Sequence, residues 1–208
     1  MKTKIKVCGI TRFEDAMSAI ASGVDALGFV FYEHSPRYIE PYAAAKIIQK
    51  LPPFVTTVGL FVNAQQSHVD QVVNISGVDV IQLHGDESPS MCNAQEKRVI
   101  KAISISAPED LLRVSDYCCA VLLDAKAPKG VYGGTGKPFD WTLLKNLKHD
   151  YPLIIAGGLN INNISNALTL QNWFAVDVSS GVEVSKGIKD SQKMQVFCEK
   201  IHEFNCKV

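Results

Sequence analysis

Two residues that can exchange protons stand where short apolar runs of the chain end. Cys8 lies in the run Lys4–Ile10, and Asp124 lies in the run Ala120–Lys126. A thiolate can take a proton from carbon when a nearby positive charge or helix end lowers the pKa of the thiol. A partly buried carboxyl group can stay protonated at neutral pH and donate. Cys8 could equally be a small buried hydrophobe, and Asp124 a helix cap or turn residue.

Further polar side chains stand at the ends of other apolar runs, where they could bind a substrate. They are Arg37 after the second run, Gln82 and His84 in the fourth, and Asp177 in the eighth. Arginine can bind a carboxylate through two parallel hydrogen bonds. His84 could orient a substrate, and Asp177 could accept from a sugar hydroxyl. The alternatives are a solvated loop charge, a hydrogen-bonded core histidine and a tie within the eighth loop.

Small residues follow the seventh and eighth runs and indicate a phosphate site. They are Gly157, Gly158, Ser179, Ser180 and Gly181. Glycine lets a backbone approach a ligand closely, and backbone N–H groups at a short helix N-terminus bind phosphate. Ordinary strand-to-helix turns are the plainer interpretation. The two loops together favour phosphate binding, because eight-stranded barrels commonly bind phosphate between the loops after strands seven and eight.

The elements that must position these residues alternate regularly between apolar runs and helical stretches. Near-continuous apolar runs are typical of parallel strands covered on both faces. We expect strands at Lys4–Ile10, Ala26–Tyr32, Thr56–Val62, Val78–Gly85, Arg98–Ser104, Ala120–Lys126, Leu153–Gly158 and Phe174–Ser180. We expect helices near 13–22, 41–51, 65–75, 88–97, 107–116, 140–148, 160–169 and 190–204. Pro41, Pro89 and Pro108 fit first helical turns, and Asn160 and Asp190 fit helix N-caps.

Eight such units in 208 residues predict an α/β fold, a single (β/α)8 TIM barrel over residues 1–208. The competing doubly wound sheet usually has fewer strands. A weak repeat supports the barrel, since Ser22–Asp25 and Ser76–Asp79 share one sequence and lie two units apart. In a barrel the site lies at the carboxyl ends of the strands, where all the residues above would meet. The Gly-rich loop Ala127–Pro138 is the expected lid.

Composition limits the partners. Lys plus Arg and Asp plus Glu are both 21, so the net charge is zero and we expect no nucleic-acid partner. The apolar runs are far shorter than the ~20 residues of a membrane span, and no signal peptide is evident, so we expect a cytoplasmic chain without membrane association. The histidines and cysteines lack metal-site spacing, and no nucleotide-binding glycine motif is present. We therefore expect no metal and no cofactor.

Several blocks together resemble the phosphoribosylanthranilate isomerase family of tryptophan biosynthesis, in family order and across nearly the whole chain. The blocks are Lys6–Thr11, Gly28–Phe31, Ser35–Tyr38, Val80–Gly85, Leu122–Asp124, Gly133–Gly136 with Phe139–Trp141, Ala156–Leu159 and Asp177–Glu183. Each block alone is weak, but the combination is specific. The segment Ala127–Tyr132 varies in this family, so the resemblance gives no guide to the lid.

The resemblance implies a (β/α)8 barrel that needs neither cofactor nor metal. It implies the third step of tryptophan synthesis from chorismate, an Amadori rearrangement of N-(5-phosphoribosyl)anthranilate to 1-(2-carboxyphenylamino)-1-deoxyribulose 5-phosphate. Cys8 would be the general base and Asp124 the general acid. Arg37 would contact the anthranilate end, and the loops after strands seven and eight would hold the phosphate. We expect a small phosphorylated substrate and a monomer or homodimer.

Two other kinds of function remain open from the sequence. Another sugar-phosphate enzyme would need a different constellation. An indole-glycerol-phosphate synthase needs a catalytic lysine, for which Lys101 is the candidate, but the matching glutamates are missing. A histidine-pathway isomerase would have aspartate in place of Cys8. The second kind is a phosphate-binding barrel without catalysis, which the presence of both Cys8 and Asp124 argues against.

Overall fold

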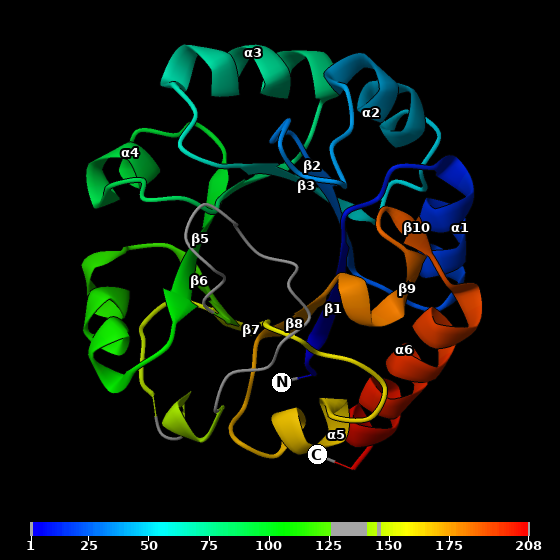
Figure 1. Cartoon of the computed structure of the whole chain (residues 1–208), viewed down its shortest axis with the longest axis vertical. Helices are drawn as coiled ribbons and strands as arrows, with labels where there is room; N and C mark the ends of the chain where they lie inside the picture. The colour runs from blue at the N-terminus through cyan, green and yellow to red at the C-terminus, as the bar shows by residue number, and fades with distance from the viewer. Residues whose placement is uncertain (1, 126–140, 145–146, 208) are drawn as a thin grey trace.

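Each apolar run predicted as a strand forms a strand of one closed barrel in the computed structural model, which describes residues 2–125, 141–144 and 147–207. Within this part of the chain all neighbouring barrel strands are parallel, and β8 closes the barrel against β1 (Figure 1). The strands are β1 (Lys4–Cys8), β2 (Ala26–Val30), β3 (Thr56–Phe61), β4 (Val80–Leu83), β5 (Arg98–Ile105), β6 (Ala120–Ala125), β7 (Leu153–Ile155) and β8 (Ala175–Val178). The predicted (β/α)8 fold is confirmed.

Helices surround the strands on the outside of the barrel (Figure 1). They are α1 (Phe13–Ala21), α2 (Pro41–Ile48), α3 (Gln66–Ser76), α4 (Pro89–Asn93), α5 (Ile164–Leu168) and α6 (Ser191–Asn205). Two further stretches predicted as helices form 3₁₀ helices instead, η1 (Pro108–Asp116) and η2 (Trp141–Leu144). The helices after β4 and β7 are shorter than predicted. The expected lid, Ala127–Pro138, lies outside the described residues.

The helix start signals are confirmed with one exception. Pro41, Pro89 and Pro108 stand in the first turns of their helices. Asp190 caps α6, because its Oδ1 accepts from the N–H groups of the second and third helical residues. Asn160 as a helix cap was wrong. Its Oδ1 accepts from the N–H of Asn162 in a tight turn, and α5 begins later, at Ile164.

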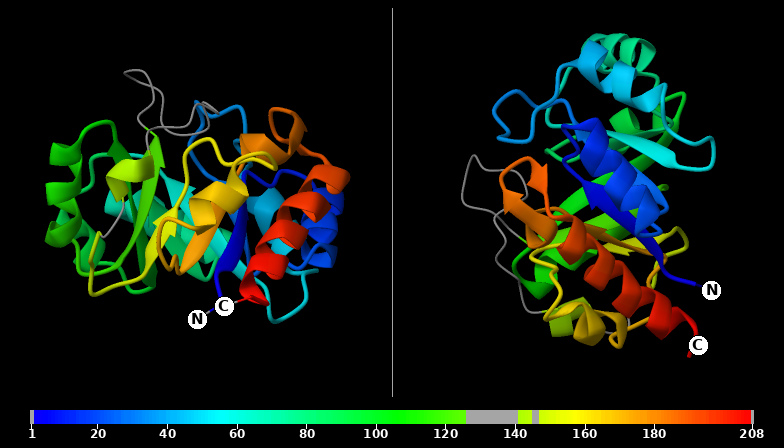
Figure 2. Two further views of the ribbon diagram at one scale, coloured as in Figure 1. Left: turned by 90° about the horizontal axis from the view of Figure 1, so that it is seen from below. Right: turned by 90° about the vertical axis from the view of Figure 1, so that its right-hand side faces the viewer.

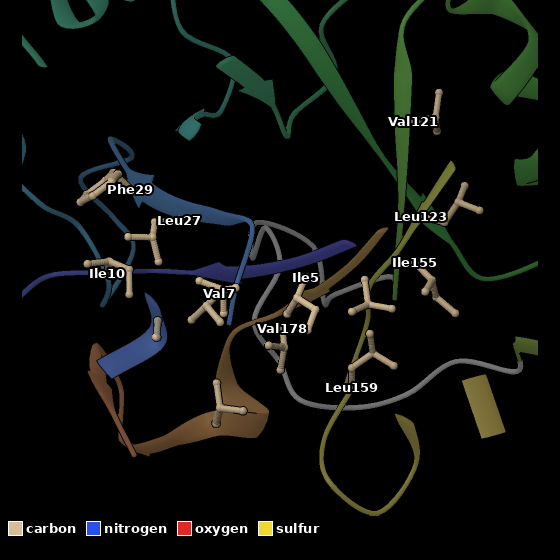
Figure 3. Close-up of a cluster of buried hydrophobic side chains, with 14 of the residues drawn as sticks. Ile5, Val7, Ile10, Leu27, Phe29, Val121, Leu123, Ile155, Leu159 and Val178 are labelled. Carbon is tan, nitrogen blue, oxygen red and sulfur yellow. The ribbon is translucent and has the colours of Figure 1, made fainter. Parts of the chain in front are cut away.

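Alternation along the strands separates two hydrophobic cores. Residues that point into the barrel form a compact inner cluster, and those that point outward pack against the helices. The inner cluster comprises Val58, Val80, Ile100, Ala102, Leu122, Ile154, Ala156 and Ala175. The outer core includes Ile5, Val7, Leu27, Leu123 and Val178, which Figure 3 shows with their neighbours. This alternation decides which polar side chains can reach the mouth of the barrel.

The weak sequence repeat has a structural cause. Gly23 and Gly77 both adopt positive φ, 88° and 74°, so the chain leaves each helix through a left-handed residue and enters the next strand. The aspartates that end the repeats, Asp25 and Asp79, each accept the backbone N–H of a residue on the preceding strand, Ile5 and Thr57. The repeat therefore fixes two strand starts on the face opposite the site.

After β8 the chain forms elements that the sequence analysis missed. They are a short 3₁₀ helix, η3 (Ser180–Val182), and an antiparallel hairpin of β9 (Glu183–Ser185) and β10 (Ile188–Lys189). The left view of Figure 2 shows the hairpin at the end of the barrel opposite the two termini. Among the described residues, none of the helices combines the length and apolar character that crossing a membrane requires.

Candidate active site

Six polar or reactive side chains occupy inward-facing positions near the carboxyl ends of the strands. They are Lys6, Cys8, Gln82, His84, Asp124 and Asp177, and the exposed fractions of Lys6 and Gln82 are only 3% and 0%. Lys6 and Cys8 alternate with the outward-facing Ile5 and Val7 on β1. The interior of the barrel is therefore apolar toward the amino ends of the strands and carries ionisable side chains toward their carboxyl ends. Active sites of (β/α)8 barrels lie at the carboxyl ends.

Asp124 lies at the end of a buried hydrogen-bonded chain. His84 Nε2 lies 3.2 Å from Asp124 Oδ2, and Gln82 Nε2 lies 3.0 Å from His84 Nδ1. The amide nitrogen of Gln82 can only donate, so His84 Nδ1 accepts and Nε2 carries the proton that points at Asp124. The other carboxyl oxygen, Oδ1, accepts from the N–H of Ala125 at 2.8 Å. The chain holds the Asp124 carboxyl group in one orientation.

Cys8 faces a gap left by a glycine on the neighbouring strand. Gly28 pairs with Cys8 in register, and a Cβ atom added at Gly28 would lie 2.8 Å from Cys8 Sγ. Cys8 belongs to a small hydrophobic cluster with Val30, Leu60 and Val62. Glycine at position 28 therefore gives the thiol the room that any other residue would take.

The surroundings of Cys8 do not meet the condition that favours a thiolate base. That condition is a nearby positive charge that lowers the pKa of the thiol. Burial instead raises the pKa of Cys8, although the charges of Lys6 and Lys189 lower it and that of Asp177 raises it further. Desolvation outweighs the two lysine charges because the thiol is only 5% exposed.

Asp177 forms a buried ion pair with a residue that the sequence analysis overlooked. Lys6 Nζ lies 2.8 Å from Asp177 Oδ1, and the two side chains are 4% and 9% exposed. Burial raises the pKa of Asp177, with Lys6 acting in the opposite direction. The charge of Asp124 also acts on Asp177, so the two carboxyl groups belong to one site.

Arg37 already binds a carboxylate of the protein itself, that of Glu183. Its Nε and Nη2 each donate to Glu183 at 2.8 Å, and both side chains are buried. Glu183 also accepts from Lys189 Nζ at 2.8 Å. A substrate carboxylate would have to use the remaining edge of the guanidinium group. Sequence reasoning missed Glu183 and Lys189 because their partners are far away in the chain.

The two predicted phosphate loops lie against each other, and the loop after β8 contacts Cys8. Gly157 and Gly158 adopt positive φ, and a Cβ atom on Gly181 would overlap the carbonyl oxygen of Leu159 in the neighbouring loop. Ser179 Oγ donates to the carbonyl oxygen of Cys8 at 2.9 Å, and Ser180 begins η3. The structure thus brings the loop after β8 to the end of β1 and the loop after β7 against it, and phosphate binding there stays a prediction.

Lys101, the lysine that a synthase would need, belongs to β5, but its side chain points outward from the barrel interior. It alternates with the inward-facing Ile100 and Ala102, and its Nζ donates to Glu87 Oε2 at 2.8 Å and to the carbonyl oxygen of Gly85 at 2.6 Å. It therefore cannot act on a substrate at the mouth of the barrel. The described residues contain no cluster of three or more His, Cys, Asp or Glu side chains placed to hold a metal ion.

Comparison with known proteins agrees with this arrangement. The family model described as "N-(5'phosphoribosyl)anthranilate (PRA) isomerase" matches residues 5–200. N-(5'-phosphoribosyl)anthranilate isomerase of Geobacter sp. (strain M21) is 50% identical over 196 residues, which cover 94% of this chain and 96% of that protein. The isomerase of Pseudomonas paraeruginosa (strain PA7) is 45% identical over 201 residues, covering 95% and 94%.

Solved structures give the same result. The crystal structure of phosphoribosyl anthranilate isomerase from Thermotoga maritima superimposes with a TM-score of 0.91 at 41% identity, covering 97% of this chain and 99% of that one. A second isomerase structure, in complex with reduced 1-(o-carboxyphenylamino)-1-deoxyribulose 5-phosphate, gives a TM-score of 0.86 at 38% identity, with the same coverage. The chain therefore belongs to the N-(5'-phosphoribosyl)anthranilate isomerase family.

Proposed function

We propose that this chain catalyses the Amadori rearrangement of N-(5-phosphoribosyl)anthranilate to 1-(2-carboxyphenylamino)-1-deoxyribulose 5-phosphate in tryptophan biosynthesis, with Asp124 as general acid and Cys8 as general base. The observation that carries the residue assignment is the set of ionisable inward-facing side chains at one end of the barrel. Membership of the isomerase family supports the reaction itself.

Asp124 acts in the first step. In its protonated form it gives its proton to the ring oxygen of the ribose, the bond between C1 and that oxygen breaks, and the nitrogen lone pair forms an iminium at C1. The buried chain from Gln82 through His84 fixes one oxygen of Asp124, and the N–H of Ala125 fixes the other. The carboxyl group consequently needs no reorientation before proton transfer.

Cys8 acts in the second step. The iminium makes the proton on C2 acidic, and the Cys8 thiolate removes it. The electron pair of the broken C–H bond forms a C1–C2 double bond and neutralises the iminium. The resulting enolamine then tautomerises to the ketone: C1 gains a proton, and the hydroxyl group on C2 loses one. Each of the two proton transfers is typically worth about 10²–10⁴ in rate.

The remaining predicted residues would hold the two ends of the substrate. Gly157, Gly158, Ser179, Ser180 and Gly181 are proposed to bind the phosphate, which the contact between their loops supports. Arg37 would bind the anthranilate carboxylate through the guanidinium edge that Glu183 leaves free. The buried group Gln82, His84 and Asp177 would line the ribose between them.

The experiment that tests this function follows the anthranilate fluorescence of freshly generated phosphoribosylanthranilate after addition of pure protein, with EDTA present. We expect a fast decay that depends on protein concentration and yields the aminoketose. A decay no faster than the spontaneous background, from protein shown by circular dichroism to be folded, would refute the proposal. Binding of a reduced product analogue in that case would support the non-catalytic barrel.

Two properties stay predictions. We expect a cytoplasmic location, and we expect either a monomer or a homodimer. One solved relative is described as monomers generated from the dimeric isomerase of Thermotoga maritima, so both states occur among the chains that this one resembles. Size-exclusion chromatography with light scattering distinguishes the two states.

A further inference from the structure

We propose that Lys6 is a positioning residue for the base: its ammonium group, anchored by Asp177 inside the barrel, is the counter-ion that accompanies the Cys8 thiolate. This rests on the proposed function, because it concerns the base of that reaction.

The backbone places Lys6 beside Cys8. The two residues are separated by one position on β1, so their side chains leave the same face of the strand and enter the barrel. Lys6 pairs in register with Asp177 on β8, and its Nζ lies 2.8 Å from Asp177 Oδ1. Because alternate residues of a strand share a face, the Lys6 side chain is the nearest same-face neighbour of Cys8 on β1. One cation therefore contacts a carboxylate and adjoins the base.

Burying the Lys6 ammonium group costs desolvation free energy, so its presence inside the barrel calls for an explanation. The Lys6 side chain is 4% exposed, and an unpaired ammonium group at that depth carries a large desolvation penalty. Buried ion pairs can often be replaced by apolar residues at little cost in stability. The inner cluster of the same barrel shows that apolar side chains fill equivalent inward positions, as Val58, Leu122 and Ile154 do. The fold alone gives no reason for a lysine here.

The other charged groups around Cys8 are less suited to the role. Lys189 on β10 donates from its Nζ to the Cys8 carbonyl oxygen at 2.6 Å and to Glu183 Oε1 at 2.8 Å. Asp177 on β8 is an anion and disfavours the thiolate. His84 and Asp124, from β4 and β6, interact with each other and with Asp177. Among the charges that act on Cys8, that of Lys6 has the largest effect.

Asp177 acts on Cys8 in two opposing ways. It holds the lysine side chain inside the barrel, although its own charge opposes formation of the thiolate. The effect of Lys6 on Cys8 exceeds that of Asp177. Removing Asp177 alone should therefore favour the thiolate, whereas removing both charges should disfavour it relative to the native chain. The first change follows from the charge of Asp177 alone, so the second change is the one that tests Lys6. A lysine that merely paired with Asp177 would leave the double variant with the same thiolate population as Asp177→Asn.

The test measures the rate of Cys8 alkylation by iodoacetamide between pH 6 and about pH 11, with Cys8 quantified by peptide mass spectrometry. The chains compared are wild type, Asp177→Asn, and the double variant Lys6→Met with Asp177→Asn. We expect the midpoint of the pH profile to fall in Asp177→Asn. In the double variant we expect it to lie about one pH unit above wild type, a tenfold loss of thiolate.

A matched control removes a second buried pair far from Cys8. Lys101 and Glu87 are 0% and 1% exposed and lie outside the barrel, so Lys101→Met with Glu87→Gln should leave the Cys8 midpoint unchanged. Equal midpoints for Asp177→Asn and the double variant would overturn the proposal. If the double variant does not fold, the single variant Lys6→Gln provides the comparison, with a midpoint above wild type expected and an unchanged midpoint contradicting us.

Kinetics complete the test. In the double variant, relative to Asp177→Asn, we expect kcat at neutral pH to fall about tenfold and to recover at high pH, with KM little changed. Because alkylation uses no substrate, it reports on Lys6 even if the chain does not isomerise phosphoribosylanthranilate. An inactive wild type with the expected alkylation midpoints would refute only the proposed function.

Discussion

Replacing Glu183 by glutamine removes the negative charge on which two buried cations depend. The carboxylate accepts from Arg37 Nε and Nη2 and from Lys189 Nζ, all at 2.8 Å, and its side chain is 4% exposed. It also accepts the N–H of Gly187 at 3.3 Å, which closes the β9–β10 hairpin. Glutamine keeps the shape of the side chain but turns an NH₂ group toward a cation.

The size of the effect follows from burial. Breaking a buried ion pair by neutralising one partner costs about 3–5 kcal/mol, because the other charge is left without compensation. Arg37 is 8% and Lys189 0% exposed in their side chains, so water cannot replace the carboxylate. We expect Glu183→Gln to lose about 3 kcal/mol of unfolding free energy or more. KM for the substrate should rise, because Arg37 and the loop after β8 are no longer fixed.

Urea unfolding, followed by circular dichroism, measures the loss. Lys4→Gln is the matched control, since it removes an ion pair with Asp25 whose side chains are 52% and 37% exposed. That variant should lose less than ~1 kcal/mol. A Glu183→Gln variant as stable as Lys4→Gln would refute the reasoning that links burial of this pair to its contribution.

The same carboxylate predicts a pH dependence. Burial alone would raise the pKa of Glu183, but the hydrogen bonds from Arg37 and the charge of Lys189 outweigh it and lower the pKa. The stabilisation is therefore complete above the ordinary glutamate value of about 4.3, and it is lost as the pH falls through the lowered value. Wild type should lose stability over this acid range more steeply than Glu183→Gln. Parallel curves would contradict this.

Three further predictions concern other parts of the site and fold. Gly28→Ala places a Cβ atom 2.8 Å from Cys8 Sγ, so kcat should fall at least about tenfold in steady-state assays, and unchanged kcat would contradict the close approach. Burial raises the pKa of Cys8, and the base must be deprotonated to act. We therefore expect kcat/KM still to rise with pH near the ordinary thiol pKa of about 8.5. A kcat/KM that reaches its plateau by pH 7 would contradict a raised pKa of Cys8. Asp190→Ala removes two hydrogen bonds at the start of α6 and should cost about 1 kcal/mol in urea unfolding, and no change would argue against the cap.

Much of the fold could be predicted because it depends on local patterns. Parallel barrel strands are covered on both faces, so they read as apolar runs such as Ala26–Tyr32, and all eight were found. Asn160 failed as a cap because an asparagine can also close a tight turn, and local sequence does not decide between the two. The helical periodicity that indicates α-helix also fits η1, whose 3₁₀ geometry the pattern does not reveal.

The site was predictable only as a set of candidates at strand ends. Lys6, Glu183 and Lys189 were missed because each is defined by a partner far along the chain, such as Asp177 for Lys6. One signal was available, since a lysine at an inward position of an apolar strand has to find a buried partner. The raised pKa of Cys8 could not be predicted, because it depends on how deeply the folded barrel buries the thiol.

The proposed reaction depends on Cys8 as its base, and the turnover of Cys8→Ala with phosphoribosylanthranilate tests this role. We expect kcat to fall at least ~100-fold while the unfolding curve stays close to that of wild type. Cys92→Ala, which removes another buried thiol outside the barrel on α4, should keep wild-type kcat. Near-wild-type turnover by folded Cys8→Ala would contradict the assignment of the base.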